Sequence, residues 1–160
     1  MKNQITRVVV VAATTTGLAI ASAVAATSQA HAATSWERTT TGATGWGSLS
    51  RSSMTYKSTY TVYDIKKDDA CAYVRFRPHV KYEGPASVWL SVGWSGYEKR
   101  VEVCGWGKSK KGTVSINVWD KMSSVDRALG VAIRMQISVC RNRNNAVDNC
   151  STFVSAKHDI

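Results

Sequence analysis

The chain has 160 residues, which is enough for one ordinary domain with a buried core, so no second domain is needed. Its formal net charge of +10 favours anionic partners, such as wall polymers, lipid headgroups, nucleic acid or acidic proteins, without choosing among them. The four cysteines contain no Cys-x-x-Cys spacing, which excludes the usual kind of zinc site.

Residues 1–32 follow the plan of a signal peptide. Lys2 and Arg7 give a positive start, an apolar run follows, and small residues precede a cleavage point after Ala32. A membrane anchor is the alternative, but residues 14–17 interrupt the apolar run and no charged stop-transfer sequence follows it. We therefore expect a secreted, extracellular protein that begins at Ala33 and has no transmembrane segment in its mature part.

Residues 33–53 consist mostly of Thr, Ser and Gly, a composition that predicts a flexible amino-terminal arm. Trp36, Trp46 and Leu49 stand out in it as large apolar residues. They either fold back onto the domain, or act as partner-binding residues of a recognition strand that enters a cleft or adds to a sheet edge.

Residues 54–160 show the alternation of polar and apolar side chains that is typical of half-buried strands. Strands are expected at 59–65, 72–77, 87–94, 97–104, 114–118, 131–140 and 152–156, with a short helix at 122–129 that stops at Gly130. The predicted fold class is all-β: a small antiparallel β-sandwich or barrel of about seven to eight strands, with one short helical crossover and two disulfides.

All four cysteines lie in this predicted β domain, and an even number of cysteines in an exported chain indicates disulfides. Three connectivities exist for Cys71, Cys104, Cys140 and Cys150. The nearest-neighbour scheme is favoured, because Cys140 with Cys150 closes a short loop and leaves Cys71 with Cys104 to join two strand regions.

Tryptophans in or beside strands divide into two groups. Trp89 and Trp119 are predicted to be core residues, because an aromatic side chain on an alternating strand usually packs inward. Trp94 and Trp106 lie among glycines and polar residues, where an exposed ring could stack on a sugar or contact a protein partner.

Basic residues form two local tips in the sequence: Lys108, Lys110 and Lys111 in one, and Arg141 and Arg143 in the other. Solubility and protection of sheet edges explain such tips, and so does binding of an anionic polymer. No nucleic-acid-binding motif accompanies them.

Catalytic chemistry has little support in the sequence. His79 and His158 are isolated, and no carboxylate pair is specified for glycoside hydrolysis. Asp64, Asp68 and Asp69 lack the periodicity of a calcium loop and fit a solvated turn. We expect no catalytic residues, no bound metal and no cofactor.

Three features of the chain occur together: a signal ending in Ala30-His31-Ala32, the segment Gly45-Trp46-Gly47-Ser48-Leu49 in the arm, and a compact four-cysteine β domain. In this plan the chain resembles the adaptor subunits of bacterial umbrella toxin particles. The resemblance implies a role in interbacterial competition, as an adaptor that links a lectin subunit to the repeat scaffold of a secreted toxin. It also implies that Trp36, Trp46 and Leu49 contact a cleft of the lectin.

The leading hypothesis is therefore a secreted, non-enzymatic protein-interaction module. A secreted glycan or cell-wall binding domain that uses Trp94 or Trp106 is the alternative, with anionic or glycan polymers as its partners. A secreted hydrolase or protease inhibitor is the third class, but no reactive-site loop bracketed by cysteines is recognisable.

Overall fold

The computed structural model describes residues 31–82, 88–93, 96–143 and 147–159. The predicted signal peptide lies outside the described residues except for its last two positions, which begin the first strand. Trp94 also lies outside them, so its predicted exposure is not addressed. None of the helices in the described part of the chain has the length and hydropathy that a membrane crossing requires.

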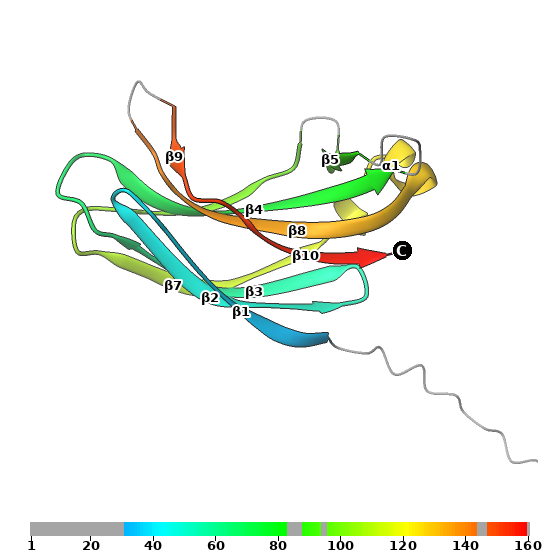
Figure 1. Cartoon of the computed structure of the whole chain (residues 1–160), viewed down its shortest axis with the longest axis horizontal. Helices are drawn as coiled ribbons and strands as arrows, with labels where there is room; N and C mark the ends of the chain where they lie inside the picture. The colour runs from blue at the N-terminus through cyan, green and yellow to red at the C-terminus, as the bar shows by residue number, and fades with distance from the viewer. Residues whose placement is uncertain (1–30, 83–87, 94–95, 144–146, 160) are drawn as a thin grey trace, which may run out of the picture.

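Two antiparallel sheets form the two layers of the molecule (Figure 1). Sheet A has the order β1-β2-β3-β7, with strands β1 (His31–Thr40), β2 (Ala43–Ser52), β3 (Thr55–Asp64) and β7 (Ser109–Asn117). Sheet B is built on β4 (Cys71–Tyr82) and β8 (Gly130–Arg141), flanked by β5 (Trp89–Ser91), β6 (Lys99–Cys104), β9 (Asn149–Cys150) and β10 (Val154–Asp159). The predicted all-β class is confirmed as a sandwich rather than a closed barrel, with ten strands in the described part of the chain where about seven to eight were expected.

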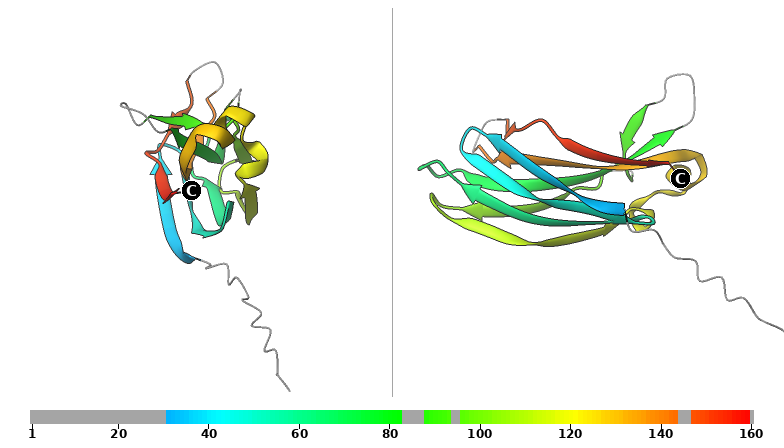
Figure 2. Two further views of the ribbon diagram at one scale, coloured as in Figure 1. Left: turned by 90° about the vertical axis from the view of Figure 1, so that its right-hand side faces the viewer. Right: turned by 60° about the horizontal axis from the view of Figure 1, so that its bottom comes forward.

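A 3-10 turn, η1 (Trp119–Lys121), and a short helix, α1 (Ser124–Leu129), cross between the sheets at one end of the sandwich (Figure 2). The Ser123 hydroxyl accepts a hydrogen bond from the Asp126 N–H at 3.1 Å, and the Asp126 carboxylate accepts one from the Ser123 N–H at 2.7 Å. This capping box starts the helix, and Gly130 ends it as expected.

Apolar side chains of the two sheets meet between the layers. Tyr56 and Val62 of β3 face Val74 and Phe76 of β4, all of them buried. Ile137 lies on the same inner face of sheet B and is fully buried. This core is the main source of stability, because burial of apolar area is the dominant favourable term in folding.

The prediction of a flexible arm at residues 33–53 is wrong. These residues form strands β1 and β2, and Trp36 and Leu49 are buried in the core with 4% of each side chain exposed. The reason is that Gly45 and Gly47 face inward and leave room for the Trp36 indole, whose Nε1–H donates to Ser58 Oγ at 3.2 Å. The alternative interpretation, in which the large apolar residues fold back onto the domain, is correct for Trp36 and Leu49.

Both disulfides follow the nearest-neighbour scheme. Cys71 pairs with Cys104 across β4 and β6, and Cys140 with Cys150 across β8 and β9. In each pair the two cysteines are direct cross-strand neighbours, with Cα atoms 4.3 Å and 4.0 Å apart. Each bond therefore fastens a short outer strand to a long central strand of sheet B.

The core predictions for two tryptophans are wrong. Val118, directly after β7, is buried, but Trp119 begins the 3-10 turn with 44% of its surface exposed, beneath the guanidinium of Arg127. Trp89 is half-buried on the three-residue edge strand β5, where the Arg134 guanidinium lies 4.3 Å from its ring centroid. The expected central strand at 87–94 is thus a short edge strand, and only residues 88–93 of it are described.

Candidate binding surface

The outer face of sheet A carries many hydroxyl side chains. The strand register aligns Ser35, Ser48, Thr59 and Thr113 in one row across all four strands. Ser48 Oγ and Thr59 Oγ1 lie 2.8 Å apart in a hydrogen bond, which orients these neighbours on the surface. A face of this kind offers many donors and acceptors with few flexible charged chains.

Trp46 stands among these hydroxyl side chains. Its cross-strand neighbours are Glu37 on β1 and Thr61 on β3, and 44% of the tryptophan is exposed. A hollow of about 270 Å³ lies beside the indole, lined by Ser35, Trp36, Glu37, Trp46 and Gly47. The indole, the Glu37 carboxylate and the hydroxyls together give a rigid apolar anchor surrounded by hydrogen-bonding groups. We name this set of residues the Trp46 surface.

The Gly45-Trp46-Gly47 segment explains how the anchor is presented. Alternation along β2 sends the side chain of Trp46 outward, while the two glycines face inward against Trp36. A Cβ at position 47 would lie 2.0 Å from the Thr59 carbonyl oxygen, so only glycine fits there. The same three residues therefore serve the core on one face and the surface on the other.

The outer face of sheet B carries a different chemistry. Glu98 accepts hydrogen bonds from Arg77 and Arg100, and the Arg75 guanidinium Nε lies 3.9 Å from its carboxylate. Burial acts to raise the pKa of Glu98, but the hydrogen bonds and charges of Arg100 and Arg77 lower it overall. Arg100 also covers the ring of Tyr73, at 4.8 Å from the centroid.

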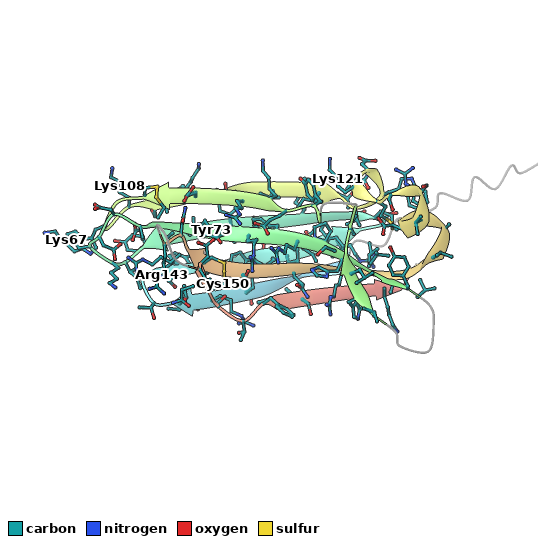
Figure 3. All side chains as sticks on the ribbon, turned by 90° about the horizontal axis from the view of Figure 1, so that it is seen from above. Lys67, Tyr73, Lys108, Lys121, Arg143 and Cys150 are labelled. Carbon is teal, nitrogen blue, oxygen red and sulfur yellow. A yellow bond between two sulfur atoms is a disulfide. The ribbon has the colours of Figure 1, made fainter. Side chains whose placement is uncertain are left out.

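Tyr73 lies beneath that guanidinium, close to Cys150 in Figure 3. Its hydroxyl donates to Asp148 at 2.6 Å. Burial and this hydrogen bond raise the pKa of Tyr73 to about 12, so the phenol stays protonated at neutral pH. The outer face of β8 is covered here as well, because Ser138 and Cys140 are buried under these long side chains.

His79 lies in the same outer face, between Arg77 and Arg134. Burial and the charges of the two arginines lower the pKa of His79 to about 4, so its imidazole is neutral at physiological pH. With its amide nitrogen turned toward the ring, Gln136 donates to His79 Nε2 at 3.0 Å. His158 lies in β10, on the neighbouring edge of the sheet.

Trp106 is exposed at the end of the sandwich opposite α1, as its sequence context predicts, with 63% of its surface accessible. The Lys67 ammonium lies 6.0 Å from its ring centroid. Its role in ligand stacking stays a prediction. Buried Asp64 ties the surrounding loops together, accepting from the Gly105 N–H at 3.1 Å and the Lys66 N–H at 3.3 Å.

The predicted basic tips are only partly present. Lys108, Lys110 and Lys111 are exposed, the last two on the edge strand β7, as edge protection requires. Arg141 is different: its side chain is 7% exposed and forms an ion pair with Asp68. The prediction of a solvated tip at Arg141 is therefore wrong, because the strand β8 ends with this side chain turned inward.

Other acidic groups are engaged in the fold. Asp126 lines a groove of about 190 Å³ beside α1 and accepts hydrogen bonds from Tyr82, Ser123 and Gly93. Burial opposes its ionisation, but these hydrogen bonds lower the pKa of Asp126 overall. Cys71, Cys104 and Glu102 lie close enough to share a metal, yet both sulfurs are bonded in the disulfide.

Among the predicted partner-binding residues, the structure thus keeps Trp46 at the surface and takes Trp36 and Leu49 into the core. Sequence reasoning missed the hydroxyl rows around Trp46, although the run of alternating Ser and Thr in both β2 and β3 carries that signal. Comparison of the chain with models of protein families and with curated protein sequences finds no match in either.

Proposed function

We propose that the protein is a secreted, non-enzymatic binding module that contacts another exported protein through the Trp46 surface. One observation carries the proposal: a half-exposed tryptophan lies on a strand that is paired on both sides, among hydroxyl groups and beside a hollow. Tryptophan is enriched among residues that dominate binding energy, and serine beside rigid aromatic rings supplies adaptable hydrogen bonds in natural binding surfaces.

Secretion is part of the same proposal. Two disulfides are typical of oxidising compartments outside the cytosol, and the amino-terminal pattern at residues 1–32 is that of a signal peptide. Mass spectrometry of the exported protein tests this step, with Ala33 as the expected first residue.

The resemblance to adaptor subunits of umbrella toxin particles suggests a lectin subunit as the partner. In the family an extended amino-terminal segment makes this contact, whereas residues 33–52 form two strands of sheet A here. The proposal therefore assigns the contact to Trp46 and its neighbours on the sheet, and leaves Trp36 and Leu49 with a role in the core.

A matched pair of tryptophan variants tests the surface. Trp46→Ala and Trp119→Ala remove rings of equal exposure, 44% each, from different parts of the molecule. The partner is first identified by affinity purification from the native culture supernatant, and its dissociation constant is then measured for both variants. We expect Trp46→Ala to weaken binding by about 30-fold, the loss typical of a central anchor, and Trp119→Ala to bind as wild type.

Equal binding by wild type and Trp46→Ala would remove the Trp46 surface from consideration. The glycan alternative is tested in the same set of proteins by tryptophan fluorescence titrated with wall polysaccharide. A saturable response that Trp106→Ala abolishes and Trp46→Ala preserves would favour the glycan-binding function instead.

A further inference from the structure

A second hollow, of about 230 Å³, lies at the loop end of the sandwich, away from the face that carries Trp46. Its lining comes from four segments of the chain: Thr41, Lys66, Arg141, Arg143 and Asn149. We propose that this hollow binds a phosphate group. Figure 3 shows Lys67, Lys108 and Arg143 gathered at this end of the molecule, with Lys121 toward the other.

Arg141 makes the hollow a built feature of the fold rather than a cluster of surface charges. Gly42 passes directly over its side chain, and a Cβ at position 42 would lie 2.5 Å from Arg141 Cδ and 2.7 Å from its Nε. The φ of Gly42 is 95°, a conformation that favours glycine. The turn between β1 and β2 is thus shaped to hold this arginine in place.

Hydrogen-bonding capacity on that guanidinium is left unused. One terminal nitrogen is paired with Asp68, but the Nε–H of Arg141 is buried without a hydrogen-bond partner among the residues that the structure describes. Buried donors in folded proteins are nearly always satisfied, so an unpaired one on a cationic group indicates an acceptor that arrives from outside.

The charge of the hollow selects the class of ligand. Lys66, Arg141 and Arg143 contribute three positive charges, and Asp68, 3.8 Å from the Lys66 ammonium, offsets one of them. A surplus of two charges matches a phosphate monoester, which carries about −1.5 to −2 at neutral pH, better than a single carboxylate or a neutral sugar. The Thr41 hydroxyl and the Asn149 amide add uncharged donors.

Size supports the same assignment. The hollow has room for a phosphate group and is smaller than the sites of about 300 Å³ or more that are typical of drug-sized molecules. The rest of a phosphate-bearing polymer or lipid would remain outside it. This inference does not depend on the Trp46 surface, because the two sets of lining residues share no member.

Inorganic phosphate is the first probe, titrated into the folded, oxidised protein at constant ionic strength and followed by NMR. We expect saturable shifts of the Thr41 and Asn149 amides and of the Arg141 Nε–H. Lys66→Gln and Arg143→Gln remove exposed side chains and should leave the fold intact while weakening binding by about tenfold each. Lys57→Gln removes an exposed lysine from β3 and serves as the matched control.

Absence of saturable shifts, or an equal loss of affinity in Lys57→Gln, would overturn the proposal. Two further arms identify the source of the phosphate monoester: a soluble sugar phosphate and vesicles of phosphatidic acid against phosphatidylcholine. Binding of either that Arg143→Gln weakens names the natural ligand class, and inorganic phosphate binding alone assigns the hollow to free phosphate.

Discussion

Two inward-facing glycines decide how the first hairpin joins the core. Trp36 lies across Gly45 and Gly47, and the nearest atom of its ring would be 3.0 Å from a Cβ at position 47. The Thr59 carbonyl oxygen would be closer still, at 2.0 Å. Neither the ring nor the backbone of a paired strand can move away cheaply, since interiors are close-packed.

Gly47→Ala should therefore destabilise the protein by about 3 kcal/mol or more, the upper range for added atoms in a packed core. Urea denaturation of the oxidised protein measures this loss. Ser50→Ala changes an outward-facing residue of the same strand and should stay within about 0.5 kcal/mol of wild type. A Gly47→Ala protein as stable as Ser50→Ala would contradict the packing of Trp36 described above.

His79 makes the stability of the protein depend on pH. Its pKa is about 4 in the folded state and 6.5 in the unfolded chain, so between these values the unfolded state binds the additional proton. The contribution of His79 to the free energy of unfolding should accordingly have its full value above pH 6.5 and decrease as the pH drops from 6.5 toward 4. Below pH 4 both states are protonated and this contribution changes no further.

The variant His79→Gln isolates that contribution, because the carboxylates titrate alike in both proteins. Denaturation at a series of pH values should show wild type losing stability relative to His79→Gln over this interval. Parallel curves for the two proteins would show that His79 has an ordinary pKa in the folded state.

Among the elements, those with a clear difference between their two faces could be predicted from the sequence. In β8 the inward positions from Ile133 to Val139 are all Ile, Met or Val, so alternation located nearly the whole strand. It located β4 and β7 only in part, at 72–77 and 114–118, because Pro78 in β4 and Lys110 and Gly112 in β7 also occupy inward positions. In β1 and β2 the inward positions include Gly45, Gly47 and Arg51, and their outward positions, apart from Glu37 and Trp46, are mostly Ser and Thr. That pattern has the composition of a loop, because the apolar partner of the glycines, Trp36, belongs to another strand.

The difference between a signal within one segment and a signal that depends on another segment also explains which residues of the candidate site could be predicted. Exposure of Trp106 follows from the glycines and polar residues around it, which the sequence displays, whereas Trp46 could not be told apart from Trp36 and Leu49 before the pairing of β1 with β2 was known, so its exposure does not follow from the sequence. Burial of Arg141 does not, since it depends on Gly42 and Asp68 in other segments of the chain. The core prediction for Trp119 failed for a different reason: it rested on the aromatic side chain alone, whereas alternation from Val114, Ile116 and Val118 gives position 119 to the opposite face, and the 3-10 turn η1 begins there.

Trp36→Ala tests whether the first hairpin belongs to the folded domain. Truncation of a buried tryptophan typically costs about 3 to 5 kcal/mol, whereas the same change in a flexible arm would cost almost nothing. Thermal and urea unfolding of Trp36→Ala beside Trp46→Ala give the comparison, with only the first expected to be strongly destabilised. Similar stability of the two variants would show that residues 33–52 form a flexible arm and are not part of the folded domain.

Across the whole molecule, the disulfides and the proposed binding surfaces are distributed unequally. Both disulfides lie within sheet B, where they fasten β6 and β9 to the central strands, and neither joins the two sheets. Sheet A has no such bond and is held to sheet B by the packing of side chains such as Tyr60 against Phe76, whose ring centroids are 6.1 Å apart. The Trp46 surface therefore depends on the core, not directly on the disulfides.

Replacing both cysteines of one disulfide at a time tests whether these bonds stabilise sheet B alone. The bonds span 33 and 10 residues, and loop-closure entropy predicts losses of about 4 kcal/mol for Cys71→Ala with Cys104→Ala and about 3 kcal/mol for Cys140→Ala with Cys150→Ala. Urea denaturation gives these values. Hydrogen exchange should at the same time show faster opening of β6 in the first variant and of β9 in the second, since each strand loses its anchor while β2 and β3 keep their partners. Exchange that rises first in β2 and β3 would show that sheet A depends directly on the disulfides, and wild-type stability in either variant would contradict the entropic role given to that bond.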